Sequence, residues 1–285
     1  MTSAGNVFLT GAAAGIGAAT VRALAERGFT VYAGVHRDKG DLDGVDGLRP
    51  VAVDVTDPAR VRAAVEEIAA GVGDGGLQAV VNNAGVIVQG PQELLPDSEL
   101  RRQLEVNTIG PVTATRHCLP LLRAGGGRVV NLSAPTARIA VPFMGPIGAS
   151  KAALASLSDA LRLELAPWHI PVVLVEPGGT ATEIFAKAAT AFDALRAEVD
   201  PAAFALYAGQ LEAVAAASAR QRLAPAETVA RLVVRAVTAG RPRRRYTAPN
   251  ARAFAVVAAL PAGLRERIVL TVSGLRPSGL RPAVG

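Results

Sequence analysis

The chain reads Thr10-Gly11-Ala12-Ala13-Ala14-Gly15-Ile16-Gly17 directly after its first apolar run, residues 6–10. Glycines at such positions permit a tight turn and let backbone N–H groups approach a pyrophosphate at the start of a helix. The spacing is G-x3-G-x-G, which differs from the G-x-G-x-x-G of the general dinucleotide fingerprint. Because the stretch lies between a predicted strand and a predicted helix over residues 16–27, it favours a nucleotide-binding loop over an ordinary turn.

Short apolar runs and helical patterns alternate after this loop. Asp57-Pro58 opens one helix, with aspartate as the N-cap and proline in the first turn. Further strands are predicted over residues 29–35, 49–53, 77–81, 128–132 and 170–175, and helices over 97–123 and 149–166. Near-continuous apolar strands that alternate with amphipathic helices indicate a parallel sheet covered on both faces. The expected fold is therefore α/β, a doubly wound parallel sheet of the Rossmann type.

The last third of the chain breaks this alternation. Residues 183–222 are alanine-rich and helical, with no strand signal, and we expect them to form an insertion that covers the substrate. Pro225 opens a further helix, residues 245–248 predict a final edge strand, and residues 250–285 predict a C-terminal helical extension. We expect residues 1–285 to form a single domain.

Composition limits the class of protein. The chain has 285 residues, of which 50% are hydrophobic and 19% charged, and its mean hydropathy of +0.31 excludes a disordered chain. Cys118 is the only cysteine, which excludes a disulfide framework and leads us to expect a cytoplasmic protein. The apolar stretch at residues 253–264 is too short to span a membrane. No cluster of His, Cys or acidic residues has the spacing of metal ligands, so we expect no metal.

The net charge of +6 comes mainly from arginine, and the densest cluster lies at residues 241–245. No aromatic residues interleave with this cluster, and no zinc-finger or helix-turn-helix pattern accompanies it. We expect a solvated face in preference to an anionic partner, and no nucleic acid.

Three more motifs follow predicted strands. Asp54-Val55 follows the third strand, Asn82-Asn83-Ala84-Gly85 the fourth, and Pro177-Gly178-Gly179-Thr180-Ala181-Thr182 the sixth. Open α/β sheets bind ligands outside the carboxyl ends of their strands, so these motifs should meet at one edge.

Together with Gly145-Pro146-Ile147-Gly148-Ala149-Ser150-Lys151, these motifs resemble the short-chain dehydrogenase/reductase family over residues 5–182. Leu161-Arg162-Leu163-Glu164-Leu165 and Val175-Glu176-Pro177-Gly178 are similar to its branch of retinol and 17β-hydroxysteroid dehydrogenases. The resemblance implies a nicotinamide cofactor, with the adenine at Asp54 and Val55 and the carboxamide at the loop that holds Thr180 and Thr182. It also implies a homodimer or homotetramer formed through the helices at 97–123 and 149–166. The remaining cofactor-binding residues that it implies are Gly11, Gly15, Ile16, Gly17, Asn83, Ala84, Gly85, Lys151, Pro177 and Gly178.

The end of the second strand predicts which cofactor is bound. Proteins that prefer NAD place an acid there to hold the ribose 2′-hydroxyl, whereas this chain has His36 and Arg37. An imidazole and a guanidinium suit a 2′-phosphate better, so we expect NADP(H) to be favoured over NAD(H).

At the reaction centre, two of the family's residues are replaced. The resemblance places a relay asparagine at Asn107 and the ribose-binding lysine at Lys151. It also places the carbonyl-polarising serine at position 134 and the proton-donating tyrosine at position 147, where this chain has Ala134 and Ile147. General acid catalysis is typically worth about 10²–10⁴-fold, so ordinary ketoreductase activity should be impaired.

Other residues could take over the proton transfer. Lys151 itself is one candidate, although it could instead only bind the ribose. Ser133 is disfavoured, because in a continued strand its side chain points to the opposite face. Thr136, Arg138 and Met144 lie in the loop before the helix, and no spacing argument selects them. His117 and His169 are better explained as a packing residue and a helix-end residue.

Three functions stay open. The favoured one is a non-standard enzyme that promotes isomerisation, cyclisation or elimination on an apolar, polyketide-like substrate. The others are a catalytically silent cofactor-binding subunit and a weak reductase with another proton donor.

Overall fold

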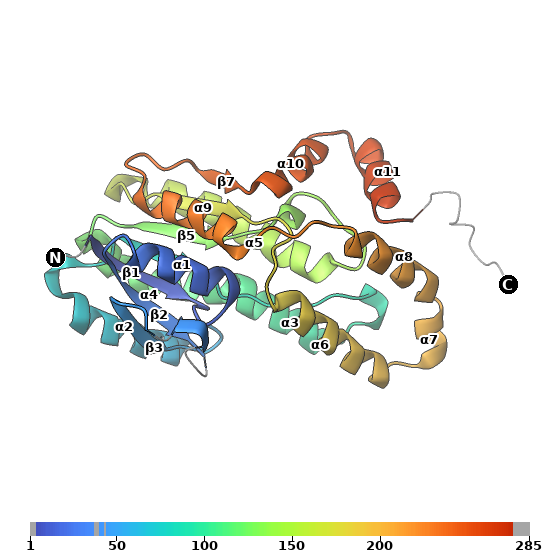
Figure 1. Cartoon of the computed structure of the whole chain (residues 1–285), viewed down its shortest axis with the longest axis horizontal. Helices are drawn as coiled ribbons and strands as arrows, with labels where there is room; N and C mark the ends of the chain where they lie inside the picture. Colours follow the sequence, from blue (N-terminus) through green and yellow to red (C-terminus); the bar gives the residue numbers. More distant parts are fainter. Residues whose placement is uncertain (1–3, 37–39, 43, 276–285) are drawn as a thin grey trace.

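Parallel strands form the centre of the molecule. Within residues 4–36, 40–42 and 44–275, which the computed structural model describes, they make a seven-stranded sheet in the order β3-β2-β1-β4-β5-β6-β7 (Figure 1). The strands are β1 (Gly5–Thr10), β2 (Phe29–Val35), β3 (Leu48–Ala52), β4 (Ala79–Asn82), β5 (Arg128–Leu132), β6 (Val172–Glu176) and β7 (Arg245–Thr247). The order reverses between β1 and β4, and at this switch point doubly wound sheets bind their ligands. The predicted fold class is confirmed.

Helices cover both faces of the sheet. In β1, Val7 and Leu9 point to one core and Phe8 to the other, because successive strand residues alternate between faces. Helices α1 (Gly15–Ala25) and α9 (Ala226–Thr238) pack on the Val7 side. Helices α2 (Pro58–Val72), α4 (Gly110–Ala124) and α5 (Gly145–Glu164) pack on the Phe8 side. Both faces of the sheet are thus covered by apolar cores, so neighbouring residues of a strand are apolar whichever face they point to. This explains the near-continuous apolar runs in the sequence.

Helix ends follow local chemistry. The Asp57 carboxylate accepts hydrogen bonds from the N–H groups of Ala59 and Arg60, so the predicted N-cap of α2 is confirmed. Helix α5 begins at Gly145, four residues earlier than predicted, because Pro146 fits the first turn of a helix.

The predicted helix over residues 97–123 is not uniform. Helix α3 (Asp97–Leu104) passes through a π-helical turn, Glu105–Ile109, before α4 begins. Such turns are rare and occur often at functional sites, and this one carries Asn107.

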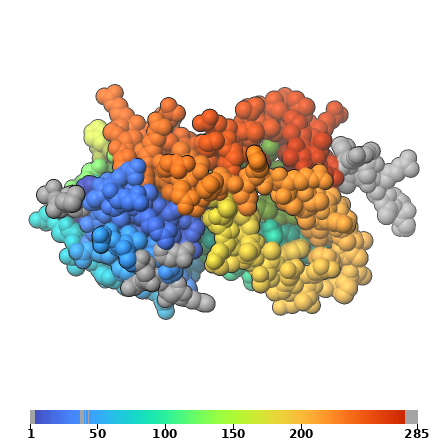
Figure 2. Space-filling model, in the orientation of Figure 1, coloured from blue at the N-terminus to red at the C-terminus, as the bar shows by residue number. Residues whose placement is uncertain are grey.

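Residues 183–222, called the helical insertion below, hold α6 (Ile184–Glu198), α7 (Pro201–Ala205) and α8 (Ala208–Ala219). In Figure 2 these segments, yellow to orange, form a lobe beside the blue N-terminal segments. Helices α10 (Arg252–Ala258) and α11 (Ala262–Val272) follow β7. In the described part of the chain no helix combines the length and apolarity needed to cross a membrane.

Candidate functional site

The glycine loop, residues 10–17, is shaped for close backbone approach. Gly11 has φ +67, and a Cβ on it would lie 2.7 Å from the Ala84 Cα. A Cβ on Gly17 would lie 2.1 Å from the Gly11 oxygen. A side chain at Gly11 would therefore push the loop away from Ala84, and one at Gly17 would distort the loop itself. Ala14 precedes α1 and supplies no side-chain cap. The first N–H groups of this helix therefore suit an anion such as a pyrophosphate.

The Asn82–Gly85 motif lies directly against the glycine loop. The Asn83 Nδ2 atom donates to the Gly11 oxygen at 2.8 Å, and the Ala84 N–H donates to Thr10 Oγ1 at 3.2 Å. Two motifs that lie 72 residues apart are thus joined by hydrogen bonds, as expected for the carboxyl ends of neighbouring strands.

The next pair of predicted residues lies beyond β2 and β3. The Nδ1 atom of His36 lies 3.6 Å from an Asp54 carboxylate oxygen. Burial raises the pKa of Asp54, but hydrogen bonds from Thr56 and the charges of His36 and Arg60 together hold it below its ordinary value. Val55 lies close to Gly110 at the start of α4, and a Cβ on this glycine would lie 3.0 Å from the Val55 side chain. Arg37 lies outside the described residues.

The 177–182 loop, which follows β6, reaches the glycine loop. A Cβ on Gly15 would lie 2.8 Å from Thr182 Cγ2. Within the loop, Thr180 Oγ1 donates to the Gly178 oxygen at 2.9 Å. Asn250 donates to the Gly179 oxygen at 2.8 Å from the turn Pro249–Ala251, so the C-terminal extension braces this loop.

Lys151, Ala134 and Ile147, the residues expected at the reaction centre, lie on α5 and on the segment that follows β5. Lys151 is 7% exposed, and its Nζ atom donates to the Leu132 oxygen at 2.7 Å. Burial lowers the pKa of its ammonium group to about 8. Ile147, one turn earlier on α5, is buried, and the turn Pro135–Ala137 that follows Ala134 packs on the start of this helix. Neither Ala134 nor Ile147 has a proton to donate.

Asn107 holds the chain that follows the Asn82–Gly85 motif. Its amide bonds both the N–H and the oxygen of Val86, each at 2.9 Å, and reaches Ser150 Oγ at 3.4 Å. The sequence did not single out Gln103, one helical turn earlier. This residue is fully buried, accepts from the Val88 N–H at 2.6 Å and donates to the Val86 oxygen at 2.9 Å. Both amides therefore fix the backbone at Val86–Val88.

Four other candidates differ in what they contact. The hydroxyls of Ser133 and Thr136 are buried and have no hydrogen-bond partner among the described residues. Met144 precedes α5, and its oxygen accepts from the Gly148 N–H. Arg138 forms an ion pair with the Glu176 carboxylate at 2.6 Å, which occupies its guanidinium. The sequence did not single out Glu176 as a functional residue. The feature that could have pointed to it is a lone charged residue at the end of an otherwise apolar strand.

The helical insertion contacts loops on the same side of the sheet. The Tyr207 hydroxyl donates a short hydrogen bond to Glu93, and its ring meets Phe143 edge-on at 6.3 Å. Phe143 has φ +64, a left-handed conformation that is strained for a bulky residue, and its oxygen accepts from the Gly90 N–H at 2.9 Å.

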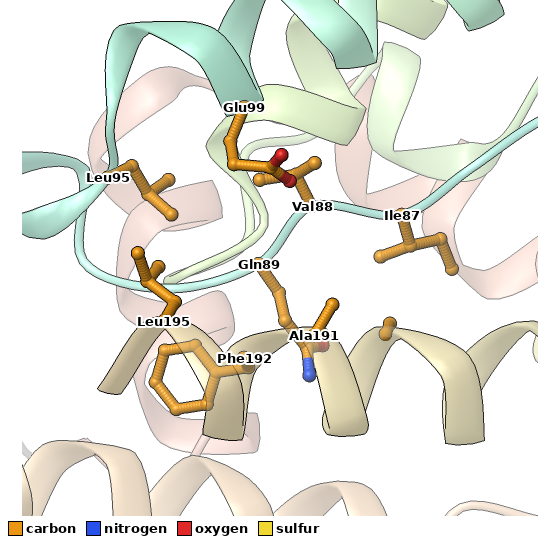
Figure 3. A pocket seen from close by; sticks show the side chains of 9 residues that line it. Ile87, Val88, Gln89, Leu95, Glu99, Ala191, Phe192 and Leu195 are labelled. Carbon is orange, nitrogen blue, oxygen red and sulfur yellow. The ribbon is translucent and has the colours of Figure 1, made fainter. Parts of the chain in front are cut away.

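A small cavity lies between α6 and the chain segment that follows β4. In Figure 3, Phe192 and Leu195 of α6 face Val88 and Gln89 of the chain after β4. The cavity measures about 20 Å³, room for about one water molecule. Its lining is mainly apolar and consists of Ile87, Val88, Gln89, Leu95, Glu99, Ala188, Ala191, Phe192 and Leu195. In the described residues no group of three or more His, Cys, Asp or Glu side chains could hold a metal ion.

Comparison with known sequences finds matches for most of the chain. Residues 5–192 match the short chain dehydrogenase family. A 3-amino-tetrahydro-pyrrolizinone reductase from Xenorhabdus hominickii is 35% identical over 182 residues, 64% of each protein. Estradiol 17-beta-dehydrogenase 2 from Rattus norvegicus is 39% identical over 189 residues, 62% of this chain and 49% of that protein. The chain thus spans about half to just under two thirds of the length of these relatives.

Comparison with solved structures gives matches over nearly the whole length. A short chain dehydrogenase from Burkholderia cenocepacia in complex with NADP superposes with a TM-score of 0.74 at 26% identity, covering 93% of this chain and 98% of the other. A short-chain dehydrogenase from Streptomyces avermitilis gives 0.75 at 27% identity, covering 95% and 98%. With the family match over residues 5–192, these findings show that the chain belongs to the short chain dehydrogenase family.

Proposed function

We propose that this chain binds NADP(H) across the glycine loop and the 177–182 loop. The close approach of Gly11 to Ala84 and the uncapped start of α1 support a site for the pyrophosphate. His36 and Arg37 would hold a 2′-phosphate, Asp54 and Val55 the adenine, and Thr180 and Thr182 the carboxamide. The related Burkholderia structure, which contains NADP, supports the same cofactor.

The chemistry of the site is the second part of the proposal. A bound nicotinamide supplies or accepts a hydride, but ordinary carbonyl reduction also needs a proton at the substrate oxygen. The residues at positions 134 and 147 are Ala134 and Ile147, which offer only aliphatic surface. This single observation carries our proposal that the protein is a non-standard enzyme, which promotes isomerisation, cyclisation or elimination on an apolar, polyketide-like substrate. Lys151 would act there as an electrostatic and proton-holding group.

A weak NADPH-dependent reductase is the second candidate. The buried ammonium of Lys151, with a pKa of about 8, can give up a proton near neutral pH. In this alternative Lys151 would protonate the substrate oxygen and become a neutral amine. The reductases and dehydrogenases among the relatives support this reading.

A silent cofactor-binding subunit is the third candidate. Apolar side chains are exposed on the helices that we expect to form the subunit contact of a homodimer or homotetramer: Leu100, Ile109, Val112, Leu157 and Leu163. Light scattering of the purified protein tests this assembly, and Leu163→Glu should shift it toward smaller species. We also retain the proposals that residues 1–285 form one domain, that the helical insertion covers the substrate and that the protein is cytoplasmic.

The first experiment is a calorimetric titration with NADPH, NADP⁺, NADH and NAD⁺. Micromolar binding that favours the two phosphorylated forms supports the cofactor proposal, and no binding of any of the four overturns it. The protein and NADPH are then incubated with a panel of apolar ketones, enones and polyenes, and the products are weighed by mass spectrometry. A product of unchanged mass, or one lighter by a water, supports isomerisation, cyclisation or elimination. A product heavier by two hydrogens identifies the weak reductase, and Lys151→Met is the matched control.

The double variant Ile147→Tyr with Ala134→Ser separates the candidates further. If the site serves another reaction, this variant remains inert toward ketones and loses the native activity. If only the proton donors were lost, NADPH-dependent ketone reduction rises by about 10²–10⁴-fold.

A further inference from the structure

Glu176 is a buried carboxylate held by side chains from two other segments. It is the last residue of β6 and is only 1% exposed. The Arg138 guanidinium binds it through two hydrogen bonds, at 2.9 and 2.6 Å. Arg245 donates a further, short hydrogen bond, and Thr247 Oγ1 donates at 2.8 Å. Each carboxylate oxygen therefore accepts two hydrogen bonds.

These partners connect three parts of the site. Arg138 lies between β5 and α5, four residues after Ala134. Arg245 and Thr247 lie on β7, and the Ala248 N–H donates to the Glu176 backbone oxygen. The next residue along the chain from Glu176 is Pro177, which opens the 177–182 loop. Glu176 thus ties the first residue of this loop to the segment after β5 and to β7.

A general fold requirement does not explain this arrangement. A charge taken out of water is costly unless it is paired, and a buried ion pair is often no more stabilising than apolar residues of similar volume. The rest of β6 is apolar and buried, and Arg138 and Arg245 each keep about a third of their side chains exposed. What the carboxylate adds is directional: four hydrogen bonds at the carboxyl end of a strand, where ligands bind.

We propose that Glu176 is a positioning residue that fixes the 177–182 loop for the nicotinamide end of the cofactor. This inference rests on the proposed function, because it requires a bound dinucleotide. This role requires no direct contact between Glu176 and the cofactor. Glu176 acts through Pro177 and Gly178 on one side and through Arg138 on the other.

The test compares two ligands on the full-length protein. NADPH carries both ends of the cofactor, whereas adenosine 2′,5′-bisphosphate carries the adenine and the 2′-phosphate but no nicotinamide. In Glu176→Gln we expect the dissociation constant for NADPH to rise about tenfold or more, and that for the bisphosphate to change less than about twofold. The control Glu183→Gln removes an exposed carboxylate just beyond the loop, paired with Lys187 at 2.8 Å, and should change neither constant.

Other results overturn the inference. If the affinities of Glu176→Gln for both ligands fall by the same factor, Glu176 supports the fold as a whole. If its affinity for NADPH is unchanged, the 177–182 loop does not depend on Glu176. If Glu176→Gln does not fold, Arg138→Met gives the same comparison, because it removes two hydrogen bonds and keeps the aliphatic stem. If the wild-type protein binds neither ligand, the proposed function fails and this inference with it. Wild-type binding combined with proportional losses in the variants refutes the inference alone.

Discussion

The Nζ atom of Lys151 donates a hydrogen bond across 2.7 Å to the carbonyl oxygen of Leu132, the last residue of β5. The amine is therefore held at the carboxyl end of the sheet by a backbone group, with no acidic partner in the hydrogen bond. A backbone oxygen stabilises an ammonium group less than a carboxylate does, so burial dominates and lowers the pKa of Lys151 to about 8.

Burial of Lys151 should make stability depend on pH. The ordinary lysine pKa is 10.5, so between about pH 8 and 10.5 the unfolded chain binds a proton at this site that the folded chain does not. Stability then rises with pH across this window, by up to roughly 3 kcal/mol. The raised pKa of the Cys118 thiol, about 12, acts in the opposite direction, so the wild type must be compared with Lys151→Met.

Urea unfolding at a series of pH values provides this comparison. Lys151→Met should gain stability relative to the wild type at pH 7, and the difference in unfolding free energy should shrink as the pH rises toward 10. A difference that stays constant from pH 7 to 10 would mean that Lys151 keeps its proton in the folded protein.

The sequence predicted the central strands well because β1, β2, β4, β5 and β6 are largely apolar runs that end in a polar or glycine-rich motif. It also placed the motifs around Gly11 and Asn83 at strand ends, where the structure joins them by a hydrogen bond. It could not find the contacts of Gln103, Glu176 and Tyr207. Each of these pairs with residues far away in the chain, and only the packing of α3, β7 and the helical insertion brings the partners together.

Gln103→Leu should weaken the hydrogen bonding that holds the backbone at Val86–Val88 in place. The substitution roughly keeps the volume but leaves the buried Val88 N–H without its partner, which costs about 1–3 kcal/mol. The Val86 oxygen loses one of its two hydrogen bonds and keeps the one from Asn107. Hydrogen exchange should speed up at residues 86–90, and urea unfolding should shift to lower concentration. Arg102→Gln is the control, because it loses a partly exposed pair with Glu99 and should change stability by less than about 1 kcal/mol. Equal effects of the two variants would contradict this role of Gln103.

Gly11→Ala should abolish cofactor binding, because its Cβ would collide with the Ala84 Cα and its φ of +67 suits glycine. Gly209→Ala makes the matched control. No atom lies within 4 Å of a Cβ at this position in α8, so alanine should stabilise the helix by about 1 kcal/mol. Titration with NADPH and a thermal melt measure both effects. Retained binding in Gly11→Ala would show that the glycine loop does not hold the cofactor.

Tyr207→Phe should loosen the helical insertion while the sheet stays intact. The substitution removes the hydrogen bond to Glu93 and keeps the ring that contacts Phe143. Trypsin should then cleave after Arg196 and Arg220 faster than in the wild type, with little change in Tm. Glu212→Gln, an exposed change in the same insertion, should leave cleavage unchanged. A large fall in Tm would instead indicate that Tyr207 supports the whole fold.

The left-handed backbone of Phe143 limits how this region can evolve. A glycine there would relieve about 1–3 kcal/mol of backbone strain, but it would also remove the ring that Tyr207 contacts. Gly90 is constrained as well, because its N–H donates to the Phe143 oxygen. Its φ of +140 favours glycine, and a Cβ on it would lie 2.8 Å from the Phe192 ring. Substitutions at Phe143, Tyr207 and Gly90 should therefore be non-additive, because Phe143 contacts the other two residues directly.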